Sequence, residues 1–104
     1  MKILTDQNFD NVVSKGVTLV DLWATWCAPC RRQAPIVEEI ASELGNKAVI
    51  CKMDVDQNPN ITKRYDVQNI PTILIFKNGT LVQTLVGLQD KSTLLNEILK
   101  YLDK

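Results

Sequence analysis

Apolar positions along this chain alternate between strand-like and helix-like spacing. Residues 17–23 are apolar on both faces apart from Asp21, which predicts a central strand covered by helices on each side. Apolar residues from about 29 to 44 then recur at helical spacing and form one stripe, and Gly45 supplies a stop signal. A buried strand running directly into an amphipathic helix is therefore the first expected unit.

The other segments extend the predicted order to βαβαβαββα. They are a short edge strand at 2–4, a helix through Phe9 capped by Thr5 or Asp6, a strand at 48–53, a short helix capped by Asn58, strands at 72–76 and 81–86, and a last helix with Leu94, Leu95, Ile98, Leu99 and Leu102 on one side. Asn78-Gly79 predicts a two-residue turn, so the last two strands pair antiparallel. We expect one α/β domain over 1–104, with a central mixed sheet flanked by helices on both faces.

The composition of the chain argues against several classes of function. Lys and Arg total 12, as do Asp and Glu, and no block of one sign occurs, so binding to nucleic acid or a membrane surface has no electrostatic support. No apolar run approaches the roughly 18 residues of a membrane span, and charge interrupts the N-terminus, so a cytoplasmic protein is expected. A monomer is expected as well. There is no histidine, so catalysis would use thiols, carboxylates or lysine.

The most specific motif is Trp26-Cys27-Ala28-Pro29-Cys30, which lies where the central strand runs into the helix. A helix N-terminus favours negative charge and lowers a cysteine pKa to roughly 3.5–7.5. Cys30 lies one turn further on the same face, where it can form a disulfide with Cys27 and attack a mixed disulfide. The spacing therefore predicts a redox-active dithiol.

Structural zinc is the alternative for a C-x-x-C pair. It needs four ligands, and only Cys51 remains to join Cys27 and Cys30. We therefore expect no metal, and exchange between thiols and disulfides would itself need no bound cofactor. Cys51 itself is expected to be a small buried hydrophobe, with regulatory oxidation as the alternative.

Asp21 and Lys52 are charged residues inside apolar strands. Asp21 is flanked by apolar neighbours and is expected to be buried, where a carboxylate with a raised pKa could remove the proton from Cys30. Lys52 could be a snorkelling edge residue or the partner of Asp21, and partnership is favoured. Side-chain alternation then places Cys51 on the opposite face of the sheet.

From end to end, the chain resembles the thioredoxin family. The resemblance is carried by the active-site block 20–30 and by Asp54-Val55-Asp56-Gln57-Asn58-Pro59, Ile70-Pro71-Thr72, Phe76-Lys77-Asn78-Gly79 and Val86-Gly87. It implies that Cys27 is an exposed nucleophile, that Cys30 is the buried resolving thiol of a redox-active disulfide, and that Asp21 and Lys52 handle the proton.

The resemblance also implies a cis bond at Ile70–Pro71 and an apolar surface for protein substrates. Its residues would be Trp26, Ala28, Pro29, Ile70, Pro71, Val86 and Gly87. The implied activity is reduction of protein disulfides by a redox carrier that a separate thioredoxin reductase recycles, either a flavin enzyme using NADPH or a ferredoxin-linked enzyme. Ala28 stands where the family commonly has glycine, and we expect it to stiffen the turn.

Two other functions fit the same residues. A dithiol oxidase or isomerase would need a more oxidising potential. A thioredoxin-like binding module or subunit would use the same surface, and its cysteines would be non-catalytic. The presence of both cysteines together with Asp21 and Lys52 argues against this second alternative.

Overall fold

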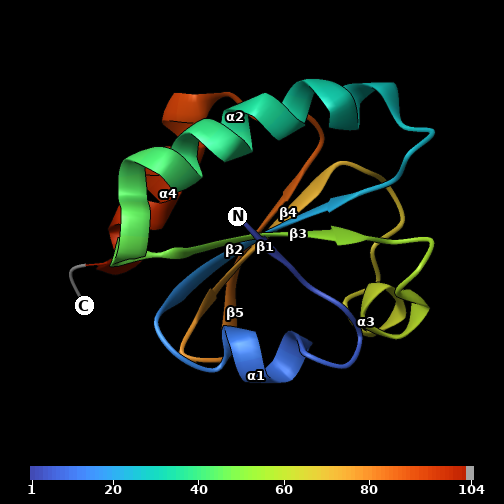
Figure 1. The fold of residues 1–104 in the computed structure, drawn as a ribbon, viewed down its shortest axis with the longest axis horizontal. Coiled ribbons are helices and arrows are strands. Elements are labelled where there is room, and N and C mark those ends of the chain that lie inside the picture. The colour runs from blue at the N-terminus through green and yellow to red at the C-terminus, as the bar shows by residue number, and fades with distance from the viewer. Residues whose placement is uncertain (103–104) are drawn as a thin grey trace.

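A five-stranded mixed sheet lies between two layers of helices in the computed structural model, which describes residues 1–102 (Figure 1). The elements are β1 (Lys2–Ile3), α1 (Phe9–Val13), β2 (Val17–Trp23), α2 (Ala28–Leu44), β3 (Val49–Asp54), α3 (Pro59–Arg64), β4 (Thr72–Lys77), β5 (Thr80–Val86) and α4 (Lys91–Leu102), with a 3₁₀ turn at Gly45–Lys47. This order and the mixed sheet confirm the prediction from hydrophobic spacing. No helix within the described part of the chain is long and apolar enough to cross a membrane.

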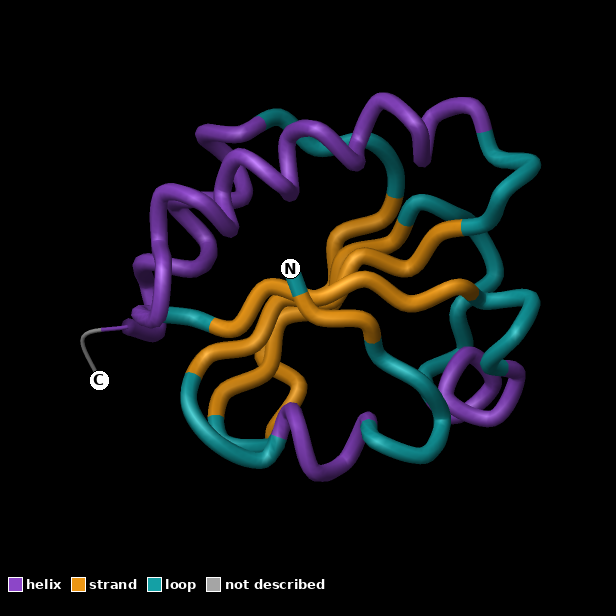
Figure 2. Tube along the Cα trace, viewed as in Figure 1, coloured by secondary structure: helices purple, strands orange, loops and turns teal. Residues whose placement is uncertain are grey.

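The sheet has the strand order β1-β3-β2-β4-β5. β1 and β2 both run parallel to β3, while β4 runs antiparallel to β2 and to β5. Because β2 and β3 are parallel, their C-terminal ends lie at the same end of the sheet, and the loops that follow them lie there (Figure 2). The cysteine motif follows β2 at this end.

Successive side chains of β2 enter two different apolar cores. Val17 and Leu19 face α2 and α4, whereas Val20 and Leu22 face the side of α1 and α3. Neighbouring strands continue both layers: Ile50, Ile73 and Ile75 join the first core, and Cys51, Met53, Leu74 and Phe76 join the second. The alternation of a strand covered on both faces thus decides which residues lie beneath α2.

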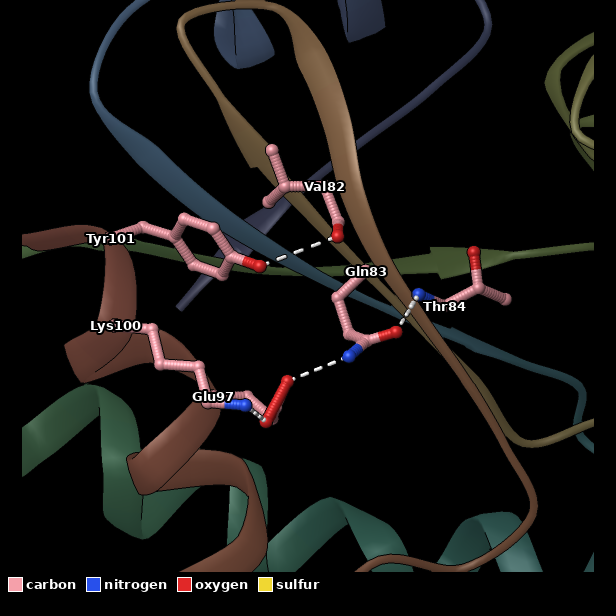
Figure 3. Close-up of polar contacts among 6 residues, drawn as sticks. All are labelled: Val82, Gln83, Thr84, Glu97, Lys100 and Tyr101. Carbon is pink, nitrogen blue, oxygen red and sulfur yellow. Dashed lines mark hydrogen bonds and ion pairs between the residues drawn. The ribbon is translucent and has the colours of Figure 1, made fainter.

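α4 is attached to β5 by polar contacts as well as by its apolar face (Figure 3). The amide of Gln83 donates to the carboxylate of Glu97 over 2.7 Å, and Glu97 also pairs with Lys100. Leu94 and Ile98 are fully buried, but Leu99 is 49% exposed, so its expected place on the buried side is wrong. The helix turns Leu99 away from the sheet while Tyr101 packs against it.

The caps expected for α1 and α3 are confirmed only in part. The N-cap position of α1 is Asn8, which makes no side-chain cap bond within the helix. The Thr5 hydroxyl accepts the N–H of Asn8 over 3.3 Å, and Asn8 Oδ1 accepts the N–H of Thr5 over 2.7 Å, so Thr5 caps the turn that leads into α1. The carboxylate of Asp6 instead accepts the free amides of Asn60 and Ile61 at the start of α3, over 3.1 and 2.9 Å. Asn58 occupies the N-cap position of α3, but its side chain bonds the backbone of Asp6 and Asp54. Asp6 thus caps a helix that is distant in sequence.

We expect Asp6→Ala to lower the free energy of unfolding by about 1–2 kcal/mol, because two helix amides lose their acceptor. Asp10→Ala is the matched control, since its ion pair with Arg64 is exposed and contributes little. Urea denaturation of both variants measures the difference. Equal stability of the two variants would contradict the capping role.

Candidate active site

Cys27 and Cys30 form a disulfide at the first turn of α2. Their Cα atoms are 5.3 Å apart, within the range that a disulfide spans. Cys27 is the N-cap residue of the helix, and its sulfur accepts the backbone N–H of Cys30 over 3.2 Å. The free amides and dipole of the helix start therefore point at the Cys27 sulfur and favour negative charge there.

Both cysteines are buried in this disulfide form, with exposed fractions of 4% for Cys27 and 3% for Cys30. The expectation that Cys27 is exposed is therefore wrong for this state. Ala24 and the cysteines form a small apolar cluster, against which the side chain of Ile70 packs. The Cys27 sulfur also lies 3.7 Å from the carbonyl oxygen of Ile70. The backbone carbonyl of Ile70 is therefore the group that lies against the Cys27 sulfur.

Asp21 lies on the α2 face of β2 and is 3% exposed, as expected. Its Oδ1 atom has no hydrogen-bond partner among residues 1–102. Burial disfavours the charged form and raises the pKa of Asp21 to about 7, while the charge of Lys52 acts in the opposite direction. The carboxyl group can therefore gain or lose a proton near neutral pH.

Lys52 lies directly beside Asp21, since the two residues are partners in the β2–β3 register. No ion pair joins them within the part of the chain that the structure describes, and the ammonium lies 5.4 Å from the centre of the Trp23 ring. Lys52 therefore acts on Asp21 through its charge, and the partnership favoured by the sequence is limited to this Coulombic effect, without an ion pair among the described residues.

A small cavity of about 110 Å³ lies between these groups and Cys30. Asp21, Lys52 and Cys30 all contribute to its walls, together with Trp23 and residues of α2. A cavity of this volume has room for water molecules, and the charged side chains of Asp21 and Lys52 on its wall offer them partners. Asp21 and Cys30 therefore face the same enclosed space.

Cys51 lies on the other side of the sheet, as side-chain alternation predicts. It is fully buried in the core below α1 and α3 and takes no part in the Cys27–Cys30 disulfide. Burial raises the pKa of its thiol to about 12, so it holds its proton at neutral pH. In this structure Cys51 is a small hydrophobic core residue.

The residues expected to contact a substrate surround the motif. Trp26 and Val86 are 67% and 58% exposed, Ala28 is exposed, Pro29 and Ile70 are partly exposed, Gly87 is half-buried and Pro71 is buried. The Ile70–Pro71 peptide bond is cis, which confirms that expectation. The N–H of Gly87 donates to the carbonyl of Pro71 over 2.8 Å, which joins the loops before β4 and after β5.

Two further contacts at the motif were not anticipated from the sequence. The indole N–H of Trp26 donates to Asp56 over 2.8 Å, and the guanidinium of Arg31 donates to the carbonyl of Thr25 over 3.0 Å. Asp56 reads as an ordinary polar loop residue in the sequence, and only the parallel pairing of β2 with β3 brings its loop to the motif. The first bond holds the exposed Trp26 ring against the loop after β3, and the second joins the first turn of α2 to the segment that precedes the motif.

Comparison with known proteins agrees with this geometry. A family model described as Thioredoxin matches residues 1–100. A protein named thioredoxin from Staphylococcus saprophyticus subsp. saprophyticus is 48% identical over 99 residues, which cover 95% of each chain. A thioredoxin from Staphylococcus aureus strain Mu50 shows the same identity and coverage.

The buried carboxyl of Asp21 makes a testable contribution to stability. Its pKa is raised in the folded state from 3.8 to about 7, so the folded protein holds this proton more tightly than the unfolded chain. The stability contribution is therefore largest below pH 4 and is lost as the pH rises to about 7. We expect a loss of about 4 kcal/mol at about 1.4 kcal/mol per pKa unit.

Asp21→Asn should remove this decline, so the oxidised variant should be more stable than the oxidised wild type above pH 7. Urea denaturation at a series of pH values measures the difference in the free energy of unfolding. A difference that does not change between pH 4 and 8 would show that Asp21 titrates normally.

Proposed function

The chain belongs to the thioredoxin family and is a thiol-disulfide oxidoreductase, and from this premise we propose that it reduces protein disulfides through Cys27 as nucleophile and Cys30 as resolving thiol. The observation that carries the proposal is the disulfide at the start of α2, in which the Cys30 N–H points at the Cys27 sulfur. The amides of the helix start stabilise negative charge on Cys27 more directly than on Cys30, which lies a turn deeper.

The exchange balances over two steps. The Cys27 thiolate attacks one sulfur of the substrate disulfide, a mixed disulfide forms, and the first substrate thiolate leaves. The Cys30 thiol then loses its proton and attacks the Cys27 sulfur, which releases the second substrate thiolate and leaves Cys27 and Cys30 joined. Two electrons pass to the substrate, and the oxidised chain is the form that the structure describes.

We assign the proton transfer at Cys30 to Asp21. Its raised pKa and its place on the wall of the Cys30 cavity support this role, because a general base works best with a pKa near the working pH. Lys52 lies on the same wall and opposes the rise in the Asp21 pKa, so it tunes the base without pairing with it. The two residues thus act on the resolving step.

The proposed substrate surface is the apolar rim around the disulfide. It comprises Trp26, Ala28, Pro29, Ile70, Pro71, Val86 and Gly87. The exposed Trp26 and Val86 side chains would contact a substrate through apolar area, and the backbone of Ile70 would pair with an extended segment. A balanced charge on the chain is consistent with recognition by shape.

The family gives the chain disulfide-containing substrates and a reductase as partners. We propose that residues 1–104 act as one domain, as a monomer in the cytoplasm, and that the reductase is a flavin enzyme using NADPH or a ferredoxin-linked enzyme. The free thiol of Cys51 suits a reducing compartment. Assay of the oxidised chain with each class of reductase distinguishes the two donors.

Cys30→Ser should accumulate a covalent mixed disulfide with a protein substrate such as insulin, because the adduct on Cys27 then has no resolving thiol. Mass spectrometry of the non-reduced product identifies the adduct and its attachment site. Cys51→Ala in the same background is the control and should leave the yield unchanged. A folded Cys30→Ser variant that forms no adduct, or one attached at Cys51, would contradict the assignment.

Asp21→Asn should slow the resolving step by roughly 10²-fold near pH 7, the usual contribution of a positioned general base, and leave the first attack by Cys27 almost unchanged. The loss should shrink as the pH rises above about 8.5, where a free thiol ionises without help. Stopped-flow measurement of both steps checks this. An equal loss in both steps would show that Asp21 acts on Cys27 instead.

A further inference from the structure

Gln33 is a polar residue at a position where the packing of α2 calls for an apolar one. The buried residues of the helix are Cys30, Gln33, Val37 and Ile40, which recur at the spacing of a single helical face. Gln33 is fully buried, and a buried amide is costly unless its donor and its acceptor are both satisfied. Its presence one turn after Cys30 therefore needs a specific partner.

That partner is the backbone of one loop residue. The Gln33 amide donates from Nε2 to the carbonyl of Gln89 over 3.1 Å, and its Oε1 accepts the N–H of the same residue over 2.8 Å. Gln89 lies in the short segment 87–90 between β5 and α4. Both bonds of one buried side chain thus go to a single peptide position, which fixes the distance and the orientation of that loop against α2.

The same loop is tied to the rim of the disulfide. The side chain of Gln89 donates to the carbonyls of Val86 and Gly87 over 3.2 and 3.3 Å. The N–H of Gly87 in turn donates to the carbonyl of Pro71. A continuous set of hydrogen bonds therefore runs from the helix that carries Cys30, through Gln33 and the loop, to the segment beside the Cys27 sulfur.

The loop presents apolar side chains to solvent on either side of Gly87. Val86 is 58% exposed and Leu88 is 44% exposed. Their place relative to the cysteines depends on how the loop is held, because segment 87–90 has no regular secondary structure of its own. An apolar residue at position 33 would fill the core as well as Gln33 but would leave both backbone groups of Gln89 without this partner.

We propose that Gln33 is a positioning residue that holds the 87–90 loop at a fixed distance from the Cys27–Cys30 pair and thereby sets the geometry for docking of protein disulfides. The inference rests on the proposed reduction of protein disulfides. Gln33 does not touch the reacting sulfurs, so its effect is confined to substrates large enough to contact the loop. A small aromatic disulfide reaches Cys27 without using it.

Gln33→Met tests this role, since methionine matches the length and helix preference of glutamine but offers neither bond. The pre-reduced chain is mixed with excess insulin or with 5,5′-dithiobis(2-nitrobenzoate), and the second-order rate constant is measured for each. We expect a fall of roughly tenfold for insulin, equivalent to about 1.4 kcal/mol of docking free energy, and less than about twofold for the small disulfide. The amide of Gln89 should also exchange its hydrogen faster.

Gln83→Met is the matched control. It removes the same amide from β5, where Gln83 bonds Glu97 of α4 and not the loop, so both rate constants should equal those of the wild type. Gln89→Ala is a second variant that keeps the core intact and removes the side-chain bonds to Val86 and Gly87. It should also lower the rate constant for insulin. In the double variant with Gln33→Met, the fall in that rate constant should be smaller than the two single effects combined.

The outcomes separate this inference from the function on which it rests. A wild-type chain that reduces the small disulfide but not insulin would overturn the proposed function and the positioning role with it. A wild-type chain that reduces insulin, with a folded Gln33→Met variant equally fast, would overturn the positioning role alone. An equal fall for both substrates would also overturn it, because Gln33 would then act on the cysteines. If Gln33→Met does not fold, an unchanged insulin rate in Gln89→Ala overturns the role.

Discussion

The central strand β2 is covered by helices on both faces, and the rest of the structure depends on this constraint. Every residue from Val17 to Leu22 is buried, so alternation along the strand divides them between two cores. α2 covers one of these faces and begins at the C-terminal end of the same strand. The start of α2, and with it the disulfide, is therefore held against a surface that the strand itself supplies.

One consequence of this constraint is chemical. Because Asp21 has the same alternation as Val17 and Leu19, it faces α2 and not α1, and it shares a cavity with Cys30. The parallel partner β3 places Lys52 beside it and Cys51 on the opposite face. A shift of one residue in the register of either strand would exchange these faces and separate the base from the thiol.

Much of this arrangement could be predicted because it follows from local spacing. The strand–helix unit around Cys27, the antiparallel hairpin at Asn78-Gly79 and the opposite faces of Cys51 and Lys52 each depend on residues close together in sequence. The cap on α3 could not, because Asp6 reaches it from more than 50 residues away. The burial of Cys27 likewise depends on a distant segment.

The role of Gln33 also could not be predicted from the sequence. In the sequence it is only a polar interruption of an apolar stripe, and such an interruption is as easily a solvated position as a buried one. Its role becomes visible only when the β5–α4 loop folds back over α2 and brings Gln89 within reach. Contacts between loops depend on the whole topology, so residues that serve them are the hardest to find by periodicity.

Among residues 1–102 the Oδ1 atom of Asp21 has no hydrogen-bond partner, and this arrangement suits the proton transfer that we propose for it. Burial of a carboxyl group with an unbonded oxygen lowers stability, and an ion pair with Lys52 would reduce that cost. Such a pair would also hold the carboxylate ionised and depress its pKa, so that it would no longer take up a proton near neutral pH. An apolar residue at position 21 would avoid this loss of stability but could accept no proton. With the Lys52 ammonium 5.4 Å from the centre of the Trp23 ring, the carboxyl keeps a pKa of about 7, and the cost in stability falls on a carboxyl that shares a cavity with Cys30.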